Sequence, residues 1–367
     1  MAIVFLIALF ALFFFKNGDG SAAAAPHWNL QQQQQHLNYF QRKSNHENTK
    51  KNVFVWSSMR HLLNSSDDRI FFHETSGKME LSFRQNCAIE SAALHNPQRP
   101  VQIFFQPQQQ SNASSAIEQS SAWFRALSRY ANVQVIVIDD DALYFKDSPL
   151  EDWYTKGEWR NSPYRVQHMA DYIRMVTLKK GGGGMYLDLD IITLKSYNGS
   201  KFHNFVTARN RERITNAAFH LERDHRLIDA IIKKQSEDYD RDDYVYNGPV
   251  VFTLAMDDLC FKGDKNVCTD VHLIIPPYFH PESTTPDDIK ETLVQDMFRR
   301  TDEPGVAQFL RQIRATSYGV HFHNFYSKHS TIDVAPNSSK VFAVLAAEHC
   351  PFTFAAAQQG HNNFFSV

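Results

Sequence analysis

Residues 181–184 are four consecutive glycines that lead into an apolar segment carrying two aspartates, Asp188 and Asp190. Side chains on a strand alternate between faces, so both carboxylates are expected on one side, about 7 Å apart along the backbone. The apolar residues around them are then expected to point into a core: Met185, Leu187 and Leu189. Two carboxylates at a strand end suit a divalent cation that holds a phosphate, because hard cations take oxygen ligands. Alone, the short Asp-x-Asp pattern is more often a solvated acidic turn.

Helical periodicity precedes the glycines over residues 164–180. Apolar side chains repeat there at the spacing of one helical face: Val166, Met169, Ala170, Ile173 and Thr177. Gly181 is expected to end this helix as a left-handed cap. Asp171 and Arg174, three residues apart on another face, are spaced for an ion pair. A plain surface pair has the same spacing, but this helix runs directly into the acidic strand. We therefore expect both residues to face the crevice that holds the two aspartates.

The first half of the chain alternates predicted strands with predicted helices. The strands are expected at residues 69–75, 100–105 and 133–138, and the helices at residues 83–94 and 116–130. This alternation predicts an α/β fold with a parallel, Rossmann-like sheet, in which ligands lie beyond the carboxyl ends of the strands. Asp139, Asp140 and Asp141 follow the third strand, where a capping or turn role is favoured over catalysis.

The second half contains weaker signals. Residues 191–195 are expected to continue the acidic strand, residues 215–219 to form a strand and residues 227–234 a helix. A turn at residues 246–249 is expected to precede a strand at residues 250–254, and another strand ends near residue 275. Residues 318–324 alternate in polarity, so His321 and His323 should share one face, where two histidines more often have structural roles. The chain shows neither a P-loop motif nor a Gly-x-Ser-x-Gly motif, which excludes the commonest P-loop and hydrolase classes.

Composition excludes some partners and limits the number of domains. The 367 residues carry a net charge of −2, so no global field attracts nucleic acid or acidic membranes. Hydrophobic residues make up 43% of the chain and include 29 phenylalanines. After removal of a leader, about 300 residues remain for one large α/β domain or two smaller ones.

The amino terminus predicts entry into the secretory pathway. Residues 1–15 are an unbroken apolar run closed by Lys16, about 22 Å long as a helix and so short of a hydrocarbon core of about 30 Å. Two interpretations compete: a cleaved signal peptide with its small-residue site at residues 23–25, and a signal anchor, which we favour. Residues 16–65 are polar, include five consecutive glutamines at residues 31–35, and are expected to form a disordered stem.

Two further signs agree with a lumenal address. Glycosylation acceptors occur at Asn64, Asn112, Asn198 and Asn337. Four cysteines in an oxidising compartment fit two disulfides, although four buried thiols are the alternative. Cys260 and Cys268 are close in sequence around Gly263, so a bridge between them would close a short loop. Cys87 and Cys350 would then tie the start of the globular part to its end.

Together these pieces resemble the α1,4-glycosyltransferase family over about residues 69–353. The resemblance rests on an ordered set of motifs: IFFHETS at residues 70–76, CAIESAA at 87–93, SPLEDWY at 148–154, DYIR at 171–174, the glycine–acid core at 183–190, NGP at 247–249, VHFHN at 320–324 and CP at 350–351. Each motif is weak alone, but their order is specific. Asn247 departs from the pattern, since many members of the family carry Gln there.

The resemblance implies a GT-A fold and a retaining transferase that uses a UDP-sugar and a divalent metal, usually Mn²⁺. Carried over by motif, Asp188 and Asp190 would hold metal and donor, with His321 as a further metal or diphosphate contact. Asp171 and Arg174 would position the donor sugar and its phosphate. Four residues would line the sugar and acceptor pocket: Asn216, Asn247, Gly248 and Pro249. The acceptor would be a glycosphingolipid or related glycan receiving galactose, N-acetylgalactosamine or N-acetylglucosamine in α1,4 linkage.

The expected organisation is one catalytic domain with a mixed sheet. Residues 1–15 form the anchor, residues 16–65 the stem, residues 66–353 the GT-A domain and residues 354–367 a tail. Within the domain, the donor half runs from about 66 to 200 and the acceptor half from about 205 to 353. The expected location is the Golgi membrane, single-pass type II, with the oligomeric state left open. Two other hypotheses are an inactive lumenal lectin or chaperone with a transferase fold, and a secreted glycosidase using paired carboxylates.

Overall fold

The computed structural model describes residues 55–57, 68–107, 121–138, 140–209, 213–262, 269–281, 297–327, 330, 334–335 and 338–359. The apolar leader at residues 1–15 lies outside the described residues, as do the acceptors Asn64, Asn112 and Asn337. Asn198 is described and exposed. No helix in the described part of the chain is both long and apolar enough to cross a membrane.

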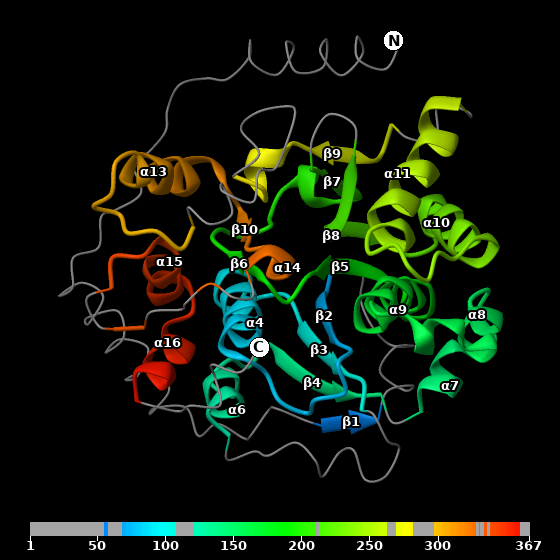
Figure 1. The fold of residues 1–367 in the computed structure, drawn as a ribbon, viewed down its shortest axis with the longest axis horizontal. Helices are drawn as coiled ribbons and strands as arrows, with labels where there is room; N and C mark the ends of the chain where they lie inside the picture. Colours follow the sequence, from blue (N-terminus) through cyan, green and yellow to red (C-terminus); the bar gives the residue numbers. More distant parts are fainter. Residues whose placement is uncertain are drawn as a thin grey trace.

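The centre of the fold is an eight-stranded mixed sheet with the order β1-β4-β3-β2-β5-β8-β7-β9 (Figure 1). Its strands are β1 (Val55–Ser57), β2 (Ile70–Glu74), β3 (Val101–Phe105), β4 (Val133–Val137), β5 (Gly183–Leu187), β7 (Phe205–Ala208), β8 (Ile214–Glu222) and β9 (His272–Ile274). The strands from β1 to β5 pair in parallel, and β8 pairs antiparallel with both β5 and β7. The predicted α/β architecture with a mixed sheet is therefore confirmed.

Helices cover both faces of this sheet, which explains why β2 and β3 are buried along their whole length. One face packs against α4 (Phe83–His95), α6 (Ala122–Leu127), α13 (Val306–Thr316), α15 (Val341–His349) and α16 (Pro351–Gln358). The other packs against α7 (Asp141–Phe145), α8 (Glu151–Lys156), α9 (Arg165–Gly181), α10 (Arg226–Glu237) and α11 (Val251–Met256). Alternate residues of β2 divide between these two cores, with Phe72 in the first and Phe71 in the second.

The predicted strands and helices of the first half are confirmed within a few residues, and so are β8 and α10. Asp140 accepts a hydrogen bond from the Leu143 amide at 2.9 Å and caps α7, as predicted, while Asp139 lies outside the described residues. The predicted helix at residues 116–130 is described only as α6, because residues 108–120 are not among the described ones.

Three predictions about elements were wrong. Residues 250–254 belong to α11 rather than a strand, and the preceding turn is a π-helical segment, η3 (Tyr246–Val250). Residues 191–193 do not continue β5; they form β6 (Ile191–Thr193), which pairs antiparallel with β10 (Gly319–His321) in a separate two-stranded sheet. β1 falls within residues 16–65, and α16 ends at Gln358, past residue 353; the division of the chain into stem, catalytic domain and tail stays a prediction. In each case tertiary packing overrides a short local pattern.

The structure explains the four-glycine run. Gly182, with φ +78°, caps α9, so the left-handed cap falls one residue later than predicted. A Cβ on Gly183 would lie 2.7 Å from the carbonyl oxygen of Leu221 on β8. The Arg69 side chain crowds Gly181 and Gly184, and it donates to the carbonyl of Gly183 at 3.0 Å and of Thr177 at 3.0 Å. Gly182 is therefore required by its left-handed backbone, and the other three positions lack room for a side chain.

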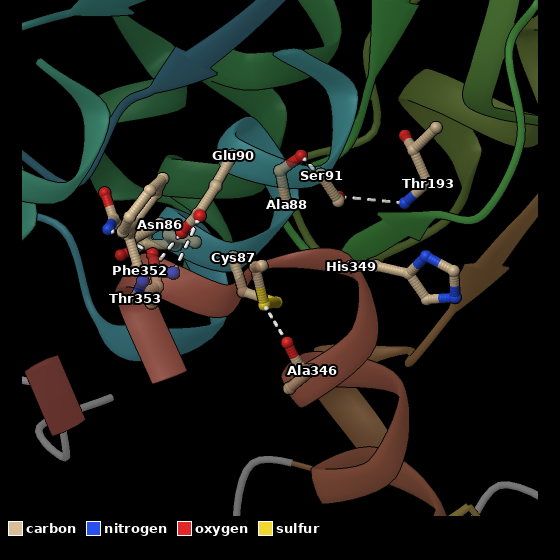
Figure 2. The surroundings of a disulfide bond; sticks show 12 residues. Asn86, Cys87, Ala88, Glu90, Ser91, Thr193, Ala346, His349, Phe352 and Thr353 are labelled. Carbon is tan, nitrogen blue, oxygen red and sulfur yellow. Dashed lines mark hydrogen bonds between the residues drawn. A yellow bond between two sulfur atoms is a disulfide. The ribbon is translucent and has the colours of Figure 1, made fainter. Parts of the chain in front are cut away.

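A disulfide joins the first core helix to the end of the described chain (Figure 2). Cys87 on α4 is bonded to Cys350, which lies between α15 and α16, as predicted from the sequence. Beside it, the buried Glu90 carboxylate accepts hydrogen bonds from the amides of Phe352 at 2.9 Å and Thr353 at 2.7 Å. Glu90 thus satisfies amides in the first turn of α16. Cys268 lies outside the described residues, so the Cys260–Cys268 pairing stays a prediction.

We predict that replacing both Cys87 and Cys350 by serine lowers the free energy of unfolding by about 2–5 kcal/mol, because the bridge closes a long loop of the unfolded chain. The two cysteines are 263 residues apart in sequence. Denaturant unfolding of the double variant and the wild type measures the difference. A loss below roughly 0.5 kcal/mol would show that the Glu90 contacts alone hold α16 in place.

A buried carboxyl group ends β2. Glu74 is 3% exposed, and one of its oxygens accepts from the Ser76 amide at 3.1 Å. Its Oε2 has no hydrogen-bond partner among the described residues. Burial raises the pKa of Glu74 to about 7, against the lowering effect of the bonds to Ser76.

This raised pKa makes stability depend on pH. The folded protein holds the Glu74 proton up to about pH 7, whereas the unfolded chain releases it near pH 4.5, so stability falls as pH rises between these values. Glu74 accounts for up to roughly 3 kcal/mol of this fall in the free energy of unfolding. Because glutamine does not titrate, we expect the Glu74→Gln variant to lack this contribution. The free energies of unfolding of both proteins, measured at pH 5 and pH 8, test this expectation. An equal change in stability between the two pH values in variant and wild type would contradict a raised pKa of Glu74.

Candidate active site

The candidate site lies where β5, β6 and β10 meet α9, β8 and η3 (Figure 1). Asp188 follows β5, and its amide still bonds to the Ala217 carbonyl of β8 at 2.8 Å. The chain then turns, because the Ile191 amide bonds back to the Asp188 carbonyl at 3.1 Å. The two aspartates therefore flank a tight turn rather than alternate along one strand. Leu189, between them, packs against the core as predicted.

Arg174 occupies the centre of the site on α9. Its guanidinium lies 3.2 Å from Asp171 Oδ1 and 3.2 Å from Asp188 Oδ1, and it donates to the carbonyl of Asn216 at 2.6 Å. It also lies 4.1 Å from the centre of the Tyr186 ring. The side chain is only 4% exposed. The predicted pair of Asp171 and Arg174 is therefore buried and extends to Asp188, which a plain surface ion pair would not do.

The Asp171 side chain is contacted by residues of three elements, α9, β8 and η3. Its Oδ1 accepts a hydrogen bond from Asn216 Nδ2 on β8 at 2.7 Å, in addition to the contact with Arg174. Gly248 of η3 approaches closely, since a Cβ there would lie 2.7 Å from the same carboxylate oxygen. Burial raises the pKa of Asp171 to about 6, while Arg174 and Asn216 lower it. The sequence prediction thus brought Asp171, Arg174, Asn216 and Gly248 correctly into one cluster.

His321 reaches the aspartates from the far end of the chain. Its Nε2 lies 3.0 Å from Asp190 Oδ1 and 4.0 Å from Asp188 Oδ2. The register of β10 with β6 pairs His321 with Ile191, the residue next to Asp190, and so fixes this approach. The Asn324 amide donates to Asp190 Oδ2 at 2.6 Å. His321 therefore lies beside both aspartates, and its role as a metal or diphosphate contact stays a prediction.

The two aspartates differ in their electrostatic surroundings. Burial raises the pKa of Asp188 above its ordinary value, although Arg174 opposes the shift. Burial also disfavours the charged form of Asp190, but the charge and hydrogen bond of His321 hold its pKa below the ordinary range. Asp190 is thus an ionised oxygen donor at neutral pH.

The three side chains fit a divalent cation. Asp188, Asp190 and His321 each offer one ligand atom, and these atoms all lie within 4.8 Å of one another. Two carboxylates and one imidazole form a mixed oxygen and nitrogen set that suits Mn²⁺ among other divalent metals. A second group of buried imidazoles meets the same criterion: His280, His321 and His323. No local sequence pattern pointed to His280, which follows the short helix at Pro276–Tyr278.

Asn247 lies deeper inside the protein than the sequence predicts. Asn247 is fully buried, and its amide contacts His168 Nε2 at 3.1 Å and donates to the Asp240 carbonyl at 2.5 Å. Its partners therefore lie inside the protein, where it fixes η3 to α9, and the expectation that it lines a pocket was wrong. The Pro249 carbonyl accepts from Thr253 at 2.8 Å and belongs to the helical path into α11.

Comparison with known proteins identifies relatives over most of the chain. Residues 82–207 match the glycosyltransferase sugar-binding region containing a DXD motif, and residues 220–357 match the alpha 1,4-glycosyltransferase conserved region. Lactosylceramide 4-alpha-galactosyltransferase of Rattus norvegicus is 27% identical over 300 residues, which cover 80% of this chain and 76% of that protein. Alpha-1,4-N-acetylglucosaminyltransferase of Homo sapiens is 25% identical over 285 residues, which cover 78% and 79%. A solved structure, PaToxG Glycosyltransferase, covers 78% of this chain and 96% of its own at 17% identity, with a TM-score of 0.42.

The close approach of Gly248 gives a test of the site geometry. We expect Gly248→Ala to lower the free energy of unfolding by about 1–3 kcal/mol, because its Cβ would overlap Asn216 Nδ2 at 2.5 Å. Adding Asn216→Ala removes one of the overlapping groups and should restore part of the loss. Denaturant unfolding of both single variants and the double variant measures this coupling. Strictly additive effects would contradict the contact.

Proposed function

The chain belongs to the α1,4-glycosyltransferase family, and we propose that it transfers galactose from UDP-galactose in α1,4 linkage to a glycosphingolipid or related glycan. It is a retaining, UDP-sugar-dependent α-glycosyltransferase. N-acetylgalactosamine and N-acetylglucosamine are the alternative donor sugars, since one relative is an α1,4-N-acetylglucosaminyltransferase. Galactose is the favoured donor sugar, because the other relative named above is a galactosyltransferase.

One observation carries the proposal. Asp188 and Asp190 flank one turn after β5, and His321 comes from β10, far along the chain, yet their ligand atoms lie within 4.8 Å of one another at the edge of the parallel strands. In open α/β sheets, ligands bind beyond the carboxyl ends of such strands. We assign the three residues to a divalent cation, with Mn²⁺ as the proposed ion. When bound, the cation would offset the negative charge that develops on the UDP leaving group.

The remaining residues of the cluster hold this geometry. The terminal N–H groups of Arg174 donate to the carboxylates of Asp171 and Asp188 and to the Asn216 carbonyl. We therefore propose that Arg174 positions the carboxylates, in place of the direct phosphate contact that the resemblance implied. Asp171, held by Arg174 and Asn216, keeps a buried carboxylate beside the sugar site. We assign no nucleophile for the retention of configuration.

The proposed location is the Golgi lumen, with the catalytic domain attached to the membrane through the apolar residues 1–15. The Cys87–Cys350 disulfide supports an oxidising compartment, because such bonds persist in secretory proteins. The exposed Asn198 is a glycosylation acceptor in the same setting.

A donor screen tests the function. The purified protein is incubated with UDP-Gal, UDP-GalNAc or UDP-GlcNAc and with a lactose-terminated acceptor, in the presence of Mn²⁺ or of a chelator. We expect transfer from one donor, strongest for UDP-Gal, and its loss on chelation. If no UDP-hexose is cleaved under any condition, the chain is an inactive member of the family.

We predict that Asp190→Asn reduces transfer at least about a hundredfold, because a neutral amide is a far weaker metal ligand than a carboxylate. Asp152→Asn is the matched control, since the Asp152 side chain is 88% exposed on α8 and away from the cluster. Transfer is measured at saturating Mn²⁺ together with thermal unfolding. Full activity in a folded Asp190→Asn protein would rule out Asp190 as a ligand.

A further inference from the structure

Four aromatic rings form a continuous row beside the acidic cluster. Tyr164 and Tyr244 have their ring centres 5.4 Å apart, Tyr244 and Phe325 4.5 Å, and Phe325 and Tyr326 5.2 Å. We call these four residues the aromatic wall. They come from the residue that precedes α9, from the segment before η3 and from α14 (Asn324–Ser327). Figure 1 shows α14 close to β6 and β10. The wall thus unites segments that are far apart in the sequence.

Two observations, one at the Phe325 end and one in the middle, place the wall next to the proposed catalytic cluster. At the metal end, the Asn324 amide donates to Asp190 Oδ2 at 2.6 Å, and Phe325 is the next residue. In the middle, burial raises the pKa of Tyr244, and the charges of Asp190, Asp188 and Asp171 raise it further. The Tyr244 hydroxyl therefore lies within electrostatic reach of all three carboxylates.

The exposure of the wall is unusual for this chain. Phe325 is 43% exposed and Tyr326 is 42% exposed, and they are the two aromatic residues among the large hydrophobic side chains exposed in the described part of the chain. The other exposed ones are Leu143, Leu254, Leu273 and Ile275. Two neighbouring exposed aromatic rings beside a charged cluster are typical of a ligand surface, because burial of such rings in a core is favourable.

We propose that the aromatic wall binds the acceptor, with the terminal sugar ring of the glycan stacked on Phe325, which packs against Tyr244 on its other side. This inference rests on the proposed function. The C–H groups on one face of a galactose ring are weakly positive and apolar, so they pack against the negative face of an aromatic ring. The hydroxyl groups at the ring edge remain free to reach the carboxylates. A neutral sugar therefore matches a surface that is apolar in its centre and acidic at its border.

The position of the wall favours the acceptor over the nucleotide. A nucleotide in an α/β sheet lies over the carboxyl ends of the parallel strands, which here are β2, β3, β4 and β5. None of the four wall residues belongs to these strands or to the turns directly after them.

The experiment measures acceptor binding without requiring turnover. The probe is octyl β-lactoside, titrated into the full protein in the presence of UDP and Mn²⁺. We expect Phe325→Ala to weaken its binding about tenfold, and Phe325→Trp to change it less than about threefold. Leu143→Ala is the control, because Leu143 on α7 is equally exposed at 43%. UDP affinity in all variants should stay within about twofold of the wild type.

Three results would overturn the proposal. Unchanged lactoside affinity in folded Phe325→Ala would remove the wall from the acceptor site. A parallel loss of UDP affinity would assign it to the nucleotide. A wild-type dimer that dissociates in Phe325→Ala, with lactoside affinity unchanged, would assign it to a second copy of the chain. A wild type that binds lactoside at the wall but cleaves no UDP-sugar would contradict the proposed function and leave this inference standing.

Discussion

The site depends on one buried, positively charged side chain, that of Arg174. Arg174 brings together Asp171 of its own helix, Asp188 after β5 and the backbone of β8, and its side chain is almost entirely removed from solvent. Removing one partner of such a buried network leaves an uncompensated charge, which typically costs about 3–5 kcal/mol. The network therefore fixes the position of Asp188, while the pairing of β10 with β6 brings His321 to Asp190. Packing and catalytic geometry are thus set by the same contacts.

Much of this arrangement can be predicted from the sequence. The periodicity of residues 164–180 and the glycines after them are enough to predict that Asp171, Arg174, Asp188 and Asp190 lie near one another. The resemblance adds His321 and Asn216, and the structure brings both into contact with the cluster. The Cys87–Cys350 bridge, expected from the positions of the four cysteines, is confirmed. These successes come from strong local patterns and from a specific order of motifs.

The rest could not be predicted, because it depends on distant contacts. The apolar residues at 250–254 fit a strand locally, but they pack as α11 against α10 and β8. Asn247 carries no local sign that its amide turns inward to His168 and Asp240. The four glycines make sense only once Arg69 and the β8 backbone are seen to crowd them. The aromatic wall joins residues 164, 244 and 325, which no periodicity connects.

We propose that Asp188, Asp190 and His321 together hold a divalent cation that holds the donor nucleotide. Calorimetric titration of UDP into the wild-type protein, first with Mn²⁺ and then after chelation, tests this assignment. We expect UDP to bind with Mn²⁺ and its affinity to fall at least about tenfold without the ion, because the diphosphate then loses its cationic partner. Equal affinity for UDP in both conditions would rule out a cation that bridges the protein and the diphosphate.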